Sequence, residues 1–220
     1  MRNNFLGLLL AVFASTFYPL PSQSMIQSSE QPLSRKVNSF QLADSSLSIA
    51  LQRLAKTSHL LVGFDSLPET DTQPASTFSV NVQDGTVREV LDALTNSDPR
   101  YIWTTSGQMI DVHPAKGRDT LSQIVIRHFK VDLVTRDQAL EALVRSPEIQ
   151  AELRQKRIKR REFNSFPGDL AAENLPRFSL DLRDLTMREI LNAIAKASDS
   201  TFWVLVKYGD QNQYLSVKMT

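Results

Sequence analysis

Residues 78–103 read FSVNVQDGTVREVLDALTNSDPRYIW, and residues 178–203, one hundred positions later, read FSLDLRDLTMREILNAIAKASDSTFW. The residues that are identical in both copies are, in the first copy, Phe78, Ser79, Asp84, Thr86, Arg88, Glu89, Leu91, Ala93 and Trp103. Most other positions carry chemically similar residues. Self-similarity at a fixed distance indicates a repeated structural unit. The sequence therefore predicts a tandem of one small building block.

A weaker match extends the repeat towards the N-terminus. FQLADSSLSIALQRLA (40–55) aligns with FKVDLVTRDQALEALV (129–144) at an offset of 89, which pairs Phe40 with Phe129 and Leu51 with Leu140. The offsets of 100 and 89 differ by eleven, so the second copy carries an insertion between its two matched blocks. Two unrelated strand–helix pieces with shared propensities remain the alternative for this shorter block.

Each copy predicts the same order of elements: strand and helix, a variable middle, then strand, helix and a two-stranded hairpin. Apolar residues at i, i+3, i+4 and i+7 from Leu47 predict the first helix, and Thr86 with Glu89, like Thr186 with Glu189, predicts a capping box at the second. The expected fold class is α+β, with helices packed on small, mostly antiparallel sheets. We expect unit one at residues 39–114 and unit two at 121–220, with a helical insertion at about 145–176.

The N-terminus predicts export. Residues 1–24 have a basic start and a short apolar run, which is the layout of a cleavable signal peptide, and an uncleaved anchor is the alternative. Residues 25–38 are polar and predict a flexible leader. The chain has no cysteine and a net charge of +1, which argues against disulfides and against nucleic acid as a partner.

Nothing in the sequence indicates an enzyme. No Gly-rich phosphate loop or nucleophile motif is present, and the three histidines (His59, His113, His128) lack metal-ligand spacing, so we expect no catalytic residues, cofactor or metal. The repeated Arg-Glu pairs are explained by helix capping, with the arginines Arg88 and Arg188 expected in solvent. Asp65, Glu69 and Asp71 are likewise expected to be solvated, and the two tryptophans to belong to the core.

One charge cluster stands out, RQKRIKRRE at 154–162. A helix starting at Ser146-Pro147 is expected to run to about Glu162 and to carry these cations. They are either a solvated helix end or a docking surface for an acidic protein, an anionic lipid or another polyanion. The candidate partner-binding residues are Arg154, Lys156, Arg157, Lys159, Arg160 and Arg161.

Unit one resembles the short N-terminal domain of secretins and TonB-dependent transducers, the STN domain. The resemblance rests on Phe40-x-Leu42, the helix from Leu47, and the later Asp84-x-Thr86-x-x-Glu89-x-Leu91 strand–helix pattern with its closing strand pair. Unit two matches in its last forty residues and more faintly at its start, as a divergent second copy. The resemblance implies two helices between small sheets, a periplasmic location and binding to other proteins, with no catalytic residues to transfer.

The resulting expectation is a periplasmic protein–protein interaction module, accessory to an envelope secretion, pilus or signalling system. Its partners would be other envelope proteins, such as a channel, a secretin or an inner-membrane regulator. The alternative is an envelope ligand-binding protein or enzyme that uses the cleft between the two units.

Overall fold

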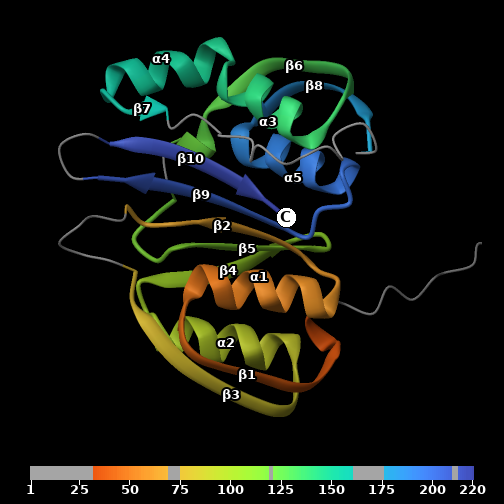
Figure 1. Cartoon of the computed structure of the whole chain (residues 1–220), viewed down its shortest axis with the longest axis vertical. Helices are drawn as coiled ribbons and strands as arrows, with labels where there is room; N and C mark the ends of the chain where they lie inside the picture. The colour runs from red at the N-terminus through yellow and green to blue at the C-terminus, as the bar shows by residue number, and fades with distance from the viewer. Residues whose placement is uncertain (1–31, 69–74, 119–120, 161–175, 210–212) are drawn as a thin grey trace, which may run out of the picture.

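The computed structural model describes residues 32–68, 75–118, 121–160, 176–209 and 213–220. The predicted signal peptide (1–24) and the first part of the predicted leader lie outside these ranges. Unit one occupies the lower half of Figure 1 and unit two the upper half. The α+β fold class is confirmed, with helices packed between sheets in both units.

The two units repeat one order of elements. Unit one consists of the 3-10 turn η1 (Pro32–Ser34), β1 (Lys36–Ser46), α1 (Leu47–Ser58), β2 (Leu61–Asp65), β3 (Thr77–Thr86), α2 (Val87–Ser97), β4 (Tyr101–Ser106) and β5 (Met109–Pro114). Unit two consists of η2 (Leu121–Gln123), β6 (Val125–Val134), α3 (Arg136–Val144), α4 (Pro147–Gln155), β7 (Lys159–Arg160), β8 (Phe178–Thr186), α5 (Met187–Ala197), β9 (Phe202–Tyr208) and β10 (Tyr214–Met219).

The repeat extends to the conformation of single residues. Capping boxes start α2 at Thr86 and α5 at Thr186, as predicted. The aspartates two positions before these caps both have a left-handed backbone, with φ of 49° at Asp84 and 52° at Asp184. Aspartate tolerates this conformation better than most side chains. The residues that are identical in both copies of the long repeat therefore form the same strand end and the same helix cap in each unit.

The shorter match at an offset of 89 is also structural. Asp44 and Leu133 have φ of 46° and 47°, at the same register shift in β1 and β6. The backbone N–H of Asp44 donates to Ser79 Oγ at 3.3 Å, and that of Leu133 to Ser179 Oγ at 3.0 Å. Two unrelated pieces would not share this geometry, so the alternative of unrelated pieces is wrong.

The prediction of a flexible leader at residues 25–38 is wrong for residues 32–38. Residues from Pro32 on are structured, and Leu33 and Val37 are buried in the core of unit one. The turn η1 stands 89 residues before η2, and each turn starts its unit. Unit one therefore begins at least seven residues before the predicted boundary, because the apolar side chains of this segment close the end of its core.

Helix α4 is shorter than predicted, since it ends at Gln155 and not near Glu162. The N–H of Ile158 donates to Leu153 O at 2.9 Å and that of Arg157 to Arg154 O at 3.1 Å. With Arg157 in a left-handed conformation at φ 55°, this is a Schellman end. Leu153 and Ile158 are both buried in the core of unit two, and their contact reverses the chain into β7.

The outer sheet of each unit is a two-stranded antiparallel pair, β1–β3 and β6–β8. The inner strands of both units join one mixed sheet in the order β4-β5-β2-β9-β10-β7. The order within each half is the same, because β2 lies parallel to β5 as β7 lies parallel to β10. The sequence predicted both hairpins, but not their union through the pairing of β2 with β9, which Figure 1 shows in the middle of the molecule.

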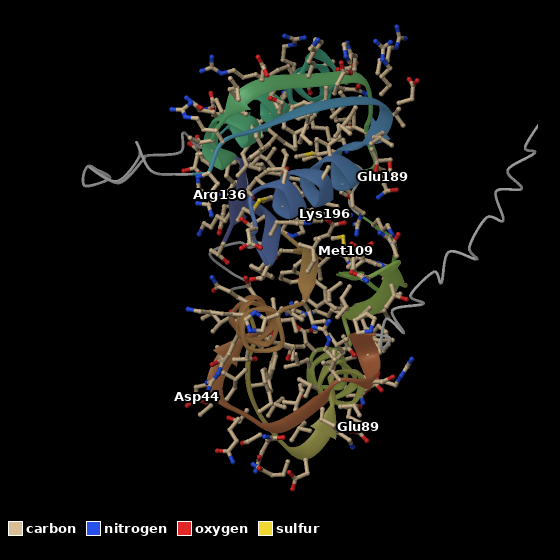
Figure 2. All side chains as sticks on the ribbon, turned by 90° about the vertical axis from the view of Figure 1, so that its right-hand side faces the viewer. Asp44, Glu89, Met109, Arg136, Glu189 and Lys196 are labelled. Carbon is tan, nitrogen blue, oxygen red and sulfur yellow. The ribbon has the colours of Figure 1, made fainter. Side chains whose placement is uncertain are left out.

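The helices of the two units cover opposite faces of this sheet. Along β9, Phe202, Val204 and Val206 pack into the core of unit one, whereas Trp203 and Leu205 pack into the core of unit two. Side chains alternate between the faces of a strand, so β9 is buried on both. In Figure 2, Met109 lies between the units, whose equivalent helices are marked by Glu89 below and Glu189 above.

Candidate interaction site

The junction between the units is a strand docked on a strand edge. Strand β2 of unit one lies parallel to β9 of unit two, with Gly63 opposite Trp203. The N–H of Val62 donates to Thr201 O and that of Ser66 to Leu205 O, both at 2.9 Å. The outward-facing backbone of β9 is thereby paired with a strand from the other unit.

Glycine at position 63 allows Trp203 to lie against β2. A Cβ atom at Gly63 would stand 2.4 Å from Cζ2 of Trp203, far inside van der Waals contact. The indole is fully buried, and its Nε1–H donates to Asn192 Oδ1 at 2.8 Å. The guanidinium of Arg188 lies over the ring, 5.8 Å from its centroid. The ring is therefore fixed on three sides.

Arg188 is the charged centre of the junction. Its guanidinium pairs with Asp65 at the end of β2, and its Nη1 lies 2.8 Å from Oδ1 of Asp111 on β5. The Ser122 hydroxyl donates to Asp65 Oδ2 at 2.9 Å. The prediction that Arg188 and Asp65 face solvent is wrong, since both side chains are buried at the junction between the units. Glu69 and Asp71 lie outside the described residues.

Unit one carries a copy of this array with nothing docked on it among the described residues. The Nε1–H of Trp103 on β4 donates to Asp92 Oδ1 at 2.9 Å, and the Arg88 guanidinium lies 5.3 Å from the indole centroid. Arg88 is exposed, Trp103 is only partly buried, and β4 is the terminal strand of the described sheet. Ile102, on the other face of β4, is 43% exposed.

The histidines do not form a site. His128 Nε2 lies 2.9 Å from Asp181 on the paired strand, and His59 is exposed at the end of α1. His113 is buried on β5, where its Nδ1 lies 3.0 Å from Pro114 O. Burial lowers the pKa of His113, the Arg118 and Arg188 cations lower it further, and the Pro114 carbonyl and Asp111 act in the opposite sense.

This lowered pKa gives a pH dependence to folding. The unfolded chain binds a proton at the ordinary histidine pKa of about 6.5, whereas the folded chain resists it. His113 therefore has no effect on stability above this pH and destabilises the fold as the pH falls below it. We expect the His113→Gln variant to lose less free energy of unfolding than the wild type between pH 7 and pH 5, measured by urea titration. His59→Gln is the control, and an unchanged slope for His113→Gln would contradict the assignment.

The predicted basic patch does not lie on one helix. Arg154 lies in the last turn of α4, Lys156 and Arg157 follow the end of the helix, and Lys159 and Arg160 belong to β7. Lys156 pairs with Glu152, with Nζ 2.9 Å from Oε1. Arg154, Arg157 and Lys159 are exposed, whereas the Arg160 side chain and Arg161 lie outside the described part. A role for these cations in binding a polyanion stays a prediction.

A groove of about 610 Å³ separates the two units on one side. Its charged lining comes from both units and is exposed to solvent, as for His59, Lys196 and Asp199. In the described residues no group of three or more acidic or histidine side chains could hold a metal ion. The groove does not gather buried, convergent polar groups of the kind that mark a small-molecule site.

Within the described ranges, no helix is both long and apolar enough to cross a membrane. The chain matches no known protein-family profile, and its sequence matches no curated protein.

Proposed function

We propose that the protein is a non-catalytic interaction module of the bacterial envelope, of the STN type, that binds another protein by strand addition at the β4 edge. Strand addition uses the unpaired backbone groups of a sheet edge for affinity and flanking side chains for specificity. The partner would be an envelope protein such as a channel component or an inner-membrane regulator, met in the periplasm.

One observation carries this proposal: among the described residues, the same edge occurs twice and is occupied once. In unit two, the edge of β9 with its Trp203 and Arg188 receives β2. In unit one, the edge of β4 has the equivalent hydrogen bond from the indole N–H to a side-chain oxygen, here of Asp92, and the same guanidinium stack. An exposed strand edge next to a half-exposed tryptophan invites pairing, and tryptophan and arginine are the side chains most enriched at binding hot spots.

A capture experiment with two variants of Thr105 tests the proposal. Thr105 corresponds to Leu205, whose backbone faces β2. Proline at this position removes the outward N–H and blocks a pairing strand, whereas alanine keeps it. We expect envelope proteins captured by the wild type and by Thr105→Ala to be lost with Thr105→Pro at unchanged thermal stability. Equal capture by both variants would refute a β4 docking site.

A further inference from the structure

We infer that the strand bound at β4 runs parallel to it, places a glycine opposite Trp103, and carries a carboxylate two residues later that pairs with Arg88. This inference rests on the proposed function and adds the chemistry of the partner. Its template is the chain's own β2, in which Gly63 lies opposite Trp203 and Asp65 meets Arg188.

The direction of the partner is that of the template, since β2 lies parallel to β9, and β4 turns the same backbone groups outward. In unit two, the carbonyls of Thr201 and Leu205 accept the bonds from β2, and their counterparts at an offset of 100 are Tyr101 and Thr105. The hydrogen bonds of the hairpins agree, since Arg100 O accepts from the Ala115 N–H after β5 and Phe202 O accepts from the Thr220 N–H after β10, so the even-numbered residues face the hairpin partner in both units. Tyr101, Trp103 and Thr105 therefore turn their backbone groups outward, as their counterparts do in β9.

The glycine follows from the indole. Trp103 and Trp203 are held by equivalent hydrogen bonds to the side chain at position 92 or 192, eleven residues before the ring. Because both rings are held alike, the Trp103 ring extends over the strand added to β4. A Cβ atom on the residue opposite Trp103 would overlap with this ring, as a Cβ at Gly63 would overlap with Trp203, so that residue is a glycine. A bulkier residue opposite Trp103 would have to displace the ring.

The carboxylate follows from Arg88. Its neighbours Glu89 and Asp92 are already engaged, Glu89 by the capping box and Asp92 by the Trp103 indole. No ion pair of Arg88 occurs with any described residue, so a docked strand would bury a cation without a partner unless it supplied one. Burying a charge is costly unless an opposite charge accompanies it. In unit two, Asp65 meets this requirement for Arg188.

A second copy of the chain fits this edge poorly. Among the described edge strands that a second copy could offer, β1, β4, β6, β7 and β8 contain no glycine. The glycine of β3, Gly85, is followed two positions later by Val87 and not by an acidic residue. None of these strands meets the requirement for a glycine and a carboxylate. The occupant is therefore a strand of another protein.

The probe is a labelled synthetic peptide with the sequence of residues 59–68, HLLVGFDSLP, titrated into the folded exported chain by fluorescence anisotropy. We expect saturable binding that weakens at least tenfold with Arg88→Glu or Thr105→Pro. Arg53→Glu, an exposed charge reversal on α1, is the control and should leave binding unchanged. A peptide with Gly63→Val should bind at least tenfold more weakly to the wild-type protein.

A charge exchange completes the test. A peptide with Asp65→Lys should fail on the wild-type protein and recover on Arg88→Glu, which only direct pairing of these two side chains explains. Binding that survives both Arg88→Glu and Thr105→Pro would mean that the peptide replaces β2 at the edge of β9, and it would overturn the inference. A third outcome is that the peptide does not bind, while envelope proteins are still captured by the wild type and lost with Thr105→Pro. This outcome would overturn the partner chemistry and keep the proposed function. Concentration-dependent dimerisation abolished by Thr105→Pro would identify a second copy as the occupant and overturn it too.

Discussion

Arg188→Ala is expected to lower the free energy of unfolding by about 3–5 kcal/mol, the cost of removing one partner from a buried ion pair. The substitution leaves Asp65 and Asp111 buried without their shared cation. It also removes the guanidinium packed on Trp203. The measurement is urea-induced unfolding of the protein at neutral pH, followed by tryptophan fluorescence and circular dichroism.

The duplicated sequence provides the control. Arg88→Ala removes the same side chain from the same position of the repeat, but Arg88 is exposed, and its interaction with the described residues is a cation–π contact with Trp103. Such a contact at an exposed site contributes about 0.5–1 kcal/mol. Equal losses for the two variants would mean that burial at the junction does not determine the cost, and the account of the junction would be wrong.

The repeat explains why the fold of each unit could be predicted from the sequence. The apolar stripes, the Thr–Glu capping boxes and the hairpin turns are local signals, and each specifies its element without reference to the other unit. The capping prediction at Thr86, for example, needs only the residue three positions later. The predictions for the leader and for the end of α4 are wrong because each segment is held by one buried residue, Leu33 and Ile158 respectively. Each of these residues is surrounded by polar residues in the sequence, so the local pattern does not show its burial.

The site could not be predicted in the same way. Arg88 and Arg188 have the same neighbours in sequence, and only the strand docked outside unit two distinguishes a buried ion pair from a solvated side chain. The expectation that Asp65 is solvated fails for the same reason, since it rests on the carboxylates that follow Asp65 in the sequence. One signal was present in Gly63, because a glycine within an apolar strand indicates the close approach of another group.

That glycine gives the second large effect. Gly63→Ala is expected to lower the free energy of unfolding by about 2–3 kcal/mol, the upper part of the range of about 1–3 kcal/mol for adding a methyl group to a packed core. The new Cβ would meet two carbons of Trp203 at 2.4 and 2.5 Å and the Met109 methyl at 2.8 Å. The Met109 methyl is the end of a flexible side chain and can move aside. Trp203 cannot, because Asn192 and Arg188 hold its ring.

A double-mutant cycle identifies the indole as the cause. In a Trp203→Leu background the added methyl group has room, so Gly63→Ala should cost less than about 0.5 kcal/mol there. In a Trp103→Leu background its full cost should remain, because that indole lies at the β4 edge, two strands away from β2. If Gly63→Ala cost as much in the Trp203→Leu background as in the wild type, the strain would lie in the backbone of β2. The template for the partner strand would then lose its glycine, whereas the carboxylate for Arg88 would still be required.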